Sequence, residues 1–163
     1  MLYAGIRREE LLGLRWEDIN FDTGFIHIKR AITYPSSKAV VGPPKTKGSD
    51  RPVAMADELI RVLKPHRQLA GYLITDGNDQ PLSEYKLKKL RTAAREYSGL
   101  PRLDARELRH SYASMLHAAG VERKLTGTSM GHTNFDTTDG YIDVEQARMN
   151  EVRNTGISYV LSH

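Results

Sequence analysis

The 163-residue chain contains no cysteine, which excludes a disulfide framework and a metal site built on thiolates. It also lacks any apolar run close to the roughly 20 residues that cross a membrane, and its first residues do not resemble a signal peptide. A chain of this length suits one domain with a sizeable core. The sequence therefore predicts a single domain located in the cytoplasm.

Motifs of several enzyme classes are missing as well. There is no glycine-rich segment ending in Lys-Ser or Lys-Thr to hold nucleotide phosphates, and no Gly-x-Ser-x-Gly elbow of a serine hydrolase. His110, His117 and His132 lack the short paired spacing of a zinc site, and residues 76–79 do not continue into a calcium loop. We therefore expect no metal and no cofactor.

Positive charge is concentrated in one part of the chain. The net charge is +4, whereas residues 86–109 alone hold eight lysines or arginines against three acids. A solvated helix face accounts for such a cluster about as well as a nucleic-acid surface does. The charge therefore permits a polyanionic partner without requiring one.

Strand signals lie near the start of the chain. Residues 19–21 and 25–30 are β-prone and flank the turn Asp22-Thr23-Gly24, which indicates a hairpin. The segment 35–49 is rich in proline, glycine and serine and predicts a long exposed loop or hairpin tip. Residues 51–55 are expected to return as a third strand. The pattern predicts a small antiparallel sheet of three strands.

Most of the remaining chain has helical patterns, and the fold class expected is α+β. Ser83 and Asp104 are suited to cap two of the helices, and an apolar face of Leu87, Leu90 and Ala94 is expected on the first of these. Helices are predicted over residues 8–17, 57–70, 83–99, 104–119, 122–130 and 144–153.

Three segments together resemble a known family. Residues 5–19 read GIRREELLGLRWEDI, residues 107–111 read ELRHS, and residues 130–132 read MGH, followed nine positions later by Tyr141. In this order and spacing they resemble the conserved boxes of the tyrosine recombinases of the phage integrase type. A lysine-containing hairpin segment lies between the first two boxes, as it does in that family.

The resemblance implies a mostly helical catalytic fold with a small three-stranded sheet near its N-terminal end. It implies an enzyme of site-specific DNA recombination, the integrase or transposase of a mobile element, that works through a 3′-phosphotyrosyl intermediate. Residues 1–163 are expected to be one catalytic domain, truncated at its N-terminus and without the upstream DNA-binding domain. The partners implied are double-stranded DNA and, in the full-length enzyme, three further copies in a tetramer on DNA.

The resemblance also assigns roles to individual residues. Arg7 and Arg109 take the positions of the arginines that clamp the phosphate, and Tyr141 takes that of the nucleophile. Guanidinium groups suit this task because they stay protonated and form bidentate, charge-assisted hydrogen bonds to developing negative charge. A phenolic oxygen forms a covalent ester that conserves the bond energy, so rejoining needs neither ATP nor metal.

In the family, a hairpin lysine protonates the departing deoxyribose oxygen. Lys45 and Lys47 both fit this role, and the spacing to Arg51 favours Lys45. His132 is expected to bind the phosphate or orient the transition state. Arg106 stands where the family usually has histidine or lysine; a guanidinium can bind phosphate, but no base role is expected there because it cannot accept a proton.

Two other functions fit the same boxes: a DNA-binding remnant without chemistry, and a type IB topoisomerase-like enzyme that relaxes supercoils. Covalent attachment to DNA separates the first from an active enzyme, and relaxation of a plasmid without a recombination site would favour the second. Further contacts with DNA are expected from Lys47, Lys88, Arg91, Arg95 and His110.

Overall fold

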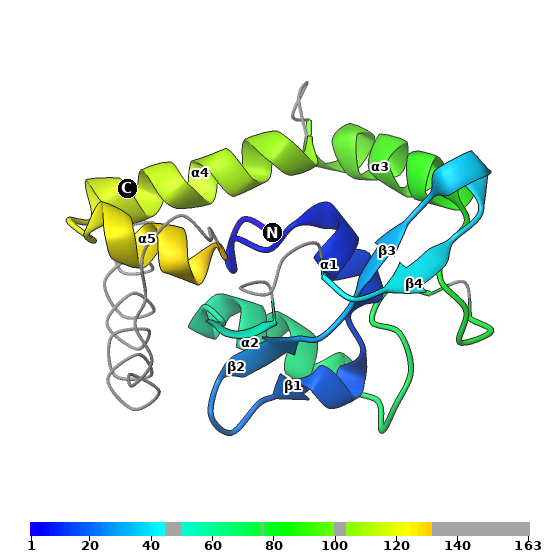
Figure 1. Cartoon of the computed structure of the whole chain (residues 1–163), viewed down its shortest axis with the longest axis horizontal. Helices are drawn as coiled ribbons and strands as arrows, with labels where there is room; N and C mark the ends of the chain where they lie inside the picture. Colours follow the sequence, from blue (N-terminus) through cyan, green and yellow to red (C-terminus); the bar gives the residue numbers. More distant parts are fainter. Residues whose placement is uncertain (45–49, 76, 100–103, 132–163) are drawn as a thin grey trace.

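The computed structural model describes residues 1–44, 50–75, 77–99 and 104–131, which form an α+β fold as the sequence predicted (Figure 1). The helices in these ranges are α1 (Arg8–Gly13), α2 (Asp57–Leu63), α3 (Glu84–Ser98), α4 (Ala105–Ala118) and α5 (Arg123–Ser129). The strands are β1 (Ile19–Asn20), β2 (Phe25–Ile28), β3 (Ala31–Thr33), β4 (Val40–Gly42) and β5 (Arg51–Ala54). No helix among the described residues has the length and apolar character needed to cross a membrane.

The predicted three-stranded antiparallel sheet is confirmed, with the strand order β1-β2-β5. In its central strand, Ile26 lies opposite Ile19 on one side and Val53 on the other. These side chains form the main core with Ala4 and Ile6 of the N-terminal segment, residues 1–7. α2 covers this core through Leu59, Ile60 and Leu63. The N-terminal segment therefore packs against the sheet and α2.

A second antiparallel pair joins β3 and β4. β4 falls within the segment that was expected to be a long exposed loop or a hairpin tip, and no strand was predicted there. β4 has little strand signal in the sequence, because it is only two valines, each 47% exposed, followed by a glycine. α1 packs against β3, and a smaller core joins Leu12, Ile32, Tyr72 and Leu87. This core connects α1 to the start of α3.

Two predicted helices are shorter than expected. The helix predicted over residues 8–17 ends at Gly13, because the Trp16 N–H donates to the Gly71 carbonyl and the Leu73 N–H donates to the Leu14 carbonyl. This pairing between distant segments outweighs local helix propensity. The helix predicted over 57–70 ends at Leu63 and continues only as a 3₁₀ turn over Lys64–His66, which contains a proline that cannot donate to an α-helical bond.

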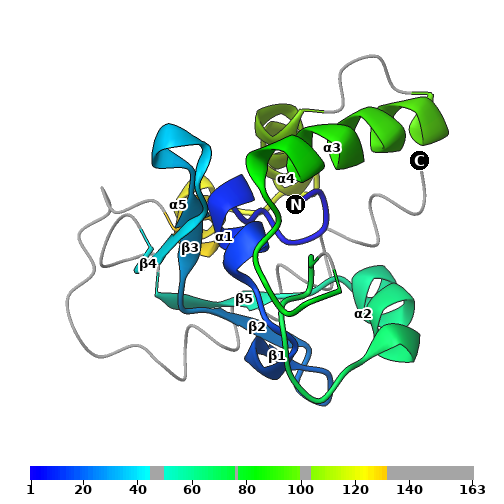
Figure 2. The ribbon, with the colours of Figure 1, turned by 90° about the vertical axis from the view of Figure 1, so that its right-hand side faces the viewer.

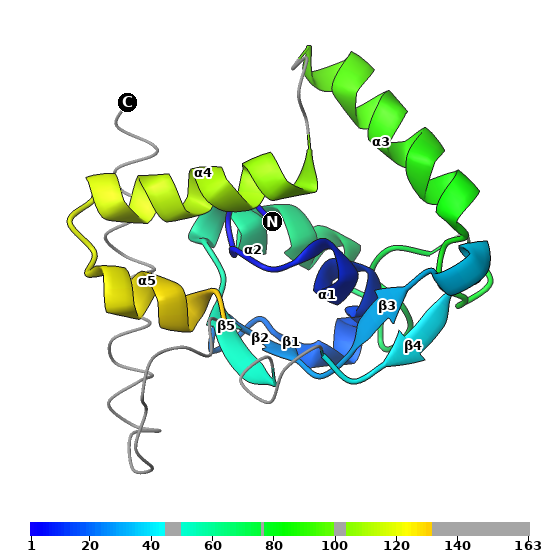
Figure 3. The ribbon, with the colours of Figure 1, turned by 45° about the horizontal axis from the view of Figure 1, so that its top comes forward.

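The caps predicted for α3 and α4 are confirmed: the Ser83 side chain accepts the Lys86 N–H, and the Asp104 side chain accepts the Arg106 N–H. On the apolar face predicted for α3, Leu87 is buried and Ala94 partly buried, but Leu90 is 46% exposed. Figure 3 shows the reason, since α3 meets the body of the molecule at its N-terminal end and extends away from it.

α4 and α5 pack together through Tyr112, Leu116, Val121 and Met130. The N-terminal segment runs beside α4 (Figures 1 and 2). Gly5 makes the close approach possible: its φ is +59°, and a Cβ atom there would lie 2.4 Å from the Tyr112 ring. The N-terminal segment can therefore lie directly against α4 just before it enters α1.

We predict that Gly5→Ala lowers the free energy of unfolding more than Gly120→Ala does. Both glycines have positive φ values, which cost an alanine about 1 kcal/mol. A Cβ atom added at Gly120 would have no described atom within 4 Å, whereas one added at Gly5 would meet the Tyr112 ring. Overpacking should add about 1–3 kcal/mol at Gly5. Urea unfolding of both variants measures the difference, and equal losses would contradict the close contact.

Candidate active site

Arg7 stands at the N-terminus of α1 and is held by a residue one turn further on. The Glu10 carboxylate accepts the backbone N–H of Arg7 at 2.8 Å and its Nη1 at 2.7 Å. The first bond satisfies a backbone donor that a helix start leaves without a partner. The second fixes the direction of the guanidinium, and the other terminal nitrogen, Nη2, donates to the Gly131 carbonyl at 2.9 Å.

Arg109 reaches the same place from α4. Its Nη1 donates to the Gly5 carbonyl at 2.5 Å and its Nη2 to the Met130 carbonyl at 2.6 Å. Arg7 and Arg109 therefore both bind the short turn that follows α5. The structure thus brings together three segments that are distant in the sequence and that carry the three motifs.

A third arginine lies beneath this pair. Arg51, the first residue of β5, is 7% exposed, and its Nη1 and Nη2 lie 3.1 and 3.2 Å from the two oxygens of Glu10. Its Nε and Nη2 also donate to the carbonyls of Ser129 and Met130, each at 3.2 Å. Glu10, itself 2% exposed, therefore pairs with Arg7 and Arg51 at once.

The charges of these four side chains do not cancel. Burial by itself would raise the pKa of Glu10, but hydrogen bonding and charge from Arg51, with hydrogen bonds from Arg7, outweigh it and lower that pKa. Burial, followed by the positive charge of Arg7, lowers the pKa of Arg109 to about 10, which leaves it protonated near neutral pH. Among the described residues, Glu10 pairs with Arg7 and Arg51, whereas Arg109 binds two neutral carbonyls. The cluster is therefore suited to bind an anion.

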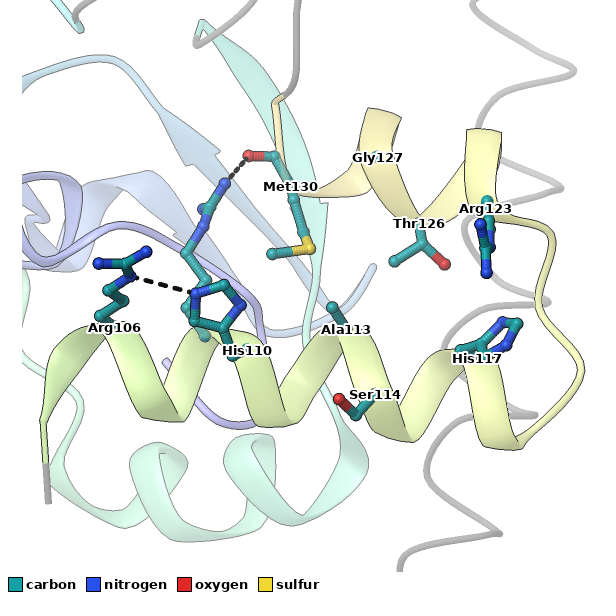
Figure 4. A pocket seen from close by; sticks show the side chains of 10 residues that line it. Arg106, His110, Ala113, Ser114, His117, Arg123, Thr126, Gly127 and Met130 are labelled. Carbon is teal, nitrogen blue, oxygen red and sulfur yellow. Dashed lines mark hydrogen bonds between the residues drawn. The ribbon is translucent and has the colours of Figure 1, made fainter. Parts of the chain in front are cut away.

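A pocket of about 430 Å³ opens beside this cluster, between α4 and α5 (Figure 4). Arg106 and His110 lie one turn apart on its α4 side, with Arg106 Nε 3.3 Å from His110 Nε2, and Met130 lies across from them. Both side chains on α4 are exposed. Ten residues line the pocket: Arg106, Arg109, His110, Ala113, Ser114, His117, Arg123, Thr126, Gly127 and Met130.

The structure describes only some of the remaining predicted residues. Lys45, Lys47, His132 and Tyr141 are outside the described residues. Lys88, Arg91 and Arg95 lie on α3, away from the pocket lining, where Arg91 Nη2 is 3.4 Å from an oxygen of Asp104. Within the described part of the chain, no group of three or more histidine or acidic side chains is placed to hold a metal ion.

Sequence reasoning missed the roles of Glu10 and Arg51. A signal existed for each of them. Glu10 follows Arg7 by three residues, a spacing at which helix side chains meet. Arg51 alternates with Val53 along a strand, which places it on the buried face, and a buried arginine requires partners.

The sequence profile of the phage integrase family matches residues 1–148. Over 83% of its length the chain is 29% identical to a XerC-like tyrosine recombinase of Caldanaerobacter subterraneus subsp. tengcongensis, of which it covers 41%. Over 94% of its length it is 28% identical to a tyrosine recombinase of Thermosipho africanus, of which it covers 50%. The chain thus spans half or less of the length of these relatives.

The fold also resembles a solved structure, that of the Tn1549 transposon integrase (residues 82–397) in complex with circular intermediate DNA. The TM-score is 0.65 at 20% sequence identity, covering 93% of this chain and 57% of the integrase chain. A match at this level confirms the expected catalytic-domain fold.

We predict that stability falls in acid because of Glu10. Its pKa is lower in the folded than in the unfolded chain, so its contribution is complete above the unfolded value near 4.5 and is lost as the pH falls through the lowered folded value. Glu10→Gln should therefore be less stable than the unmodified chain at pH 7 and should show a weaker loss of stability in acid.

The matched control is Glu9→Gln, which removes an exposed ion pair with Arg8 and should change the free energy of unfolding by less than about 1 kcal/mol. Urea titrations between pH 3 and pH 7 measure both variants. Equal pH dependence in Glu10→Gln and the unmodified chain would contradict the account.

Proposed function

The chain belongs to the phage integrase family, and from this we propose that it is the catalytic domain of a site-specific tyrosine recombinase. It cleaves and rejoins double-stranded DNA of a mobile element through a 3′-phosphotyrosyl intermediate. The observation that carries the proposal is the convergence of Arg7 and Arg109 on the carbonyls of Met130 and Gly131, immediately before His132.

In this proposal Arg7 and Arg109 bind the non-bridging oxygens of the phosphate that is attacked. Negative charge on these oxygens must be stabilised throughout the transfer. Two protonated guanidiniums that are already held by neighbouring groups need little reorganisation when negative charge develops on these oxygens. Fixed hydrogen-bond donors stabilise a transition state most effectively for this reason. His132 adds a hydrogen bond to the same phosphate.

The Tyr141 oxygen attacks phosphorus, the bond from phosphorus to the 5′-oxygen breaks, and a 3′-phosphotyrosyl ester forms. Lys45, or Lys47 two residues on, gives a proton to the departing 5′-oxygen, and the phenol proton passes to solvent. The 5′-hydroxyl of a partner strand then attacks the ester, releasing Tyr141 and joining the strands. The energy of the original bond is conserved, so the exchange needs no nucleotide.

Arg106 acts as a phosphate contact and not as a base. Its exposed side chain on α4 lies three residues before Arg109, at the mouth of the pocket. A guanidinium there donates to a phosphate oxygen but cannot take the proton of the tyrosine. Its Nε also lies beside His110, which supports a joint contact of the two residues with the DNA backbone.

DNA is the proposed partner, and the solved Tn1549 integrase is itself in complex with DNA. Lys88 and Arg95 are exposed on α3, with Arg91 partly so, and Lys47 lies on the segment before β5. We assign these cations to the phosphate backbone, where contacts position the protein without reading sequence. The active assembly is a tetramer on DNA, in which two duplexes exchange strands.

Covalent trapping on DNA tests the proposed function. A pool of nicked duplexes, drawn from the DNA that flanks the gene, lets the short cleaved fragment diffuse away and leaves the protein attached. The unmodified chain should give an adduct that survives denaturant, and Tyr141→Phe should give none. Adduct formed equally by Tyr141→Phe would contradict the nucleophile, and no adduct from the unmodified chain would favour a DNA-binding remnant. Relaxation of a plasmid without any of these sites would favour topoisomerase activity.

We further predict that Arg7→Ala and Arg109→Ala each slow adduct formation at saturating DNA at least about 100-fold, the scale of losing one preorganised donor. Arg8→Ala is the matched control, because Arg8 is the next residue but pairs at the surface with Glu9. It should keep its rate within about threefold, since an exposed pair contributes little. Similar rates for Arg7→Ala and Arg8→Ala would contradict the proposed clamp.

A further inference from the structure

Arg51 is the most deeply buried of the three arginines in the cluster, and the proposed chemistry does not use it. Its side chain is 8% exposed, against 27% for Arg7. Figure 3 shows β5 below α5 and the N-terminal segment. A guanidinium in this position is too enclosed to bind DNA directly.

The contacts of Arg51 join the supports of both proposed phosphate-binding arginines. Its fork faces both oxygens of Glu10, the same carboxylate that fixes Arg7. Its Nη2 shares the Met130 carbonyl with Arg109. Arg51 is therefore one hydrogen-bonded group away from Arg7 and one away from Arg109.

The turn before His132 is also shaped around Arg51. Gly131 has a φ of +71°, and a Cβ atom at this residue would lie 2.7 Å from Cζ of Arg51. The backbone thus passes directly over the guanidinium, while the Nε of Arg51 binds the Ser129 carbonyl. Arg51 therefore contacts the backbone of all three residues from 129 to 131.

Stability alone is a weak reason for this arrangement. The free energy lost when a charged group leaves water on burial is about as large as the attraction gained in the ion pair. Replacing such a pair by apolar side chains is therefore often neutral or stabilising. What a buried, fully bonded guanidinium does provide is a defined geometry, because its planar fork fixes several acceptors at once.

We propose that Arg51 is a positioning residue for DNA cleavage: through Glu10 and the Met130 carbonyl, it sets the placement of Arg7 and Arg109 on one phosphate. The inference rests on the proposed function and extends it to a residue that touches no substrate. Losing Arg51 should leave DNA affinity nearly unchanged and slow the chemical step.

The test measures single-turnover adduct formation against DNA concentration for Arg51→Met and Arg51→Lys. Both variants should keep the apparent Kd for DNA within about threefold and lose at least about 10-fold in rate at saturation, because small misplacements of reacting groups are costly. Arg51→Lys keeps the positive charge but not the planar guanidinium. If Arg51→Met does not fold, the rate of Arg51→Lys shows whether Arg51 is a positioning residue. A wild-type rate at saturation in a folded variant would overturn the inference.

Arg30→Met is the matched control. Arg30 Nη1 lies 2.5 Å from an oxygen of the buried Asp18, so this change also breaks a largely buried ion pair, but one outside the cluster. Urea unfolding places the variants on one stability scale. If Arg51 is a positioning residue, its variants form the adduct slowly, whereas Arg30→Met of similar stability forms it at the normal rate. Equal slowing of adduct formation in both would show a merely structural role for Arg51 and would overturn the inference. No adduct from the unmodified chain would overturn the proposed function, whereas normal adduct from every variant would overturn this inference alone.

Discussion

The structure depends on one carboxylate. Glu10 is almost fully buried and binds two guanidiniums, Arg7 from the start of its own helix and Arg51 from β5. A buried charge is tolerated only when it is paired and hydrogen-bonded, so burial of Glu10 requires both arginines to be in place. The requirement ties the N-terminal helix to the sheet, and through the carbonyls of residues 129–131 it ties both to α4 and α5.

The same constraint gives the site its chemical character. Acceptors for Arg109 are backbone carbonyls, at Gly5 and Met130, which orient the guanidinium and leave its charge in place. In the part of the chain that the structure describes, the cluster consists of three guanidiniums and one carboxylate, and these four side chains together carry an excess of positive charge suited to an anion.

The features of the fold that depend on neighbouring residues in the sequence, such as the helix caps, were predicted correctly. The caps at Ser83 and Asp104 follow from side chains that bond nearby N–H groups. The family resemblance implied that Arg7 and Arg109 act together, and in the structure both contact the backbone of residues 130–131. Strand alternation indicates that Arg51 is buried, but its partners lie 41 residues earlier and 78 residues later, and no local pattern identifies them. The early end of α1 has the same origin, in the bond from Trp16 to Gly71.

We propose that this cluster presents Arg7 and Arg109 to one phosphate. A crystal structure of Tyr141→Phe bound to an intact duplex is the direct test. We expect one phosphate contacted by both guanidiniums, with Glu10 still bridging Arg7 and Arg51 beneath them. Arginines that contact different phosphates, or a Glu10 that has separated from Arg51 in the complex, would contradict it.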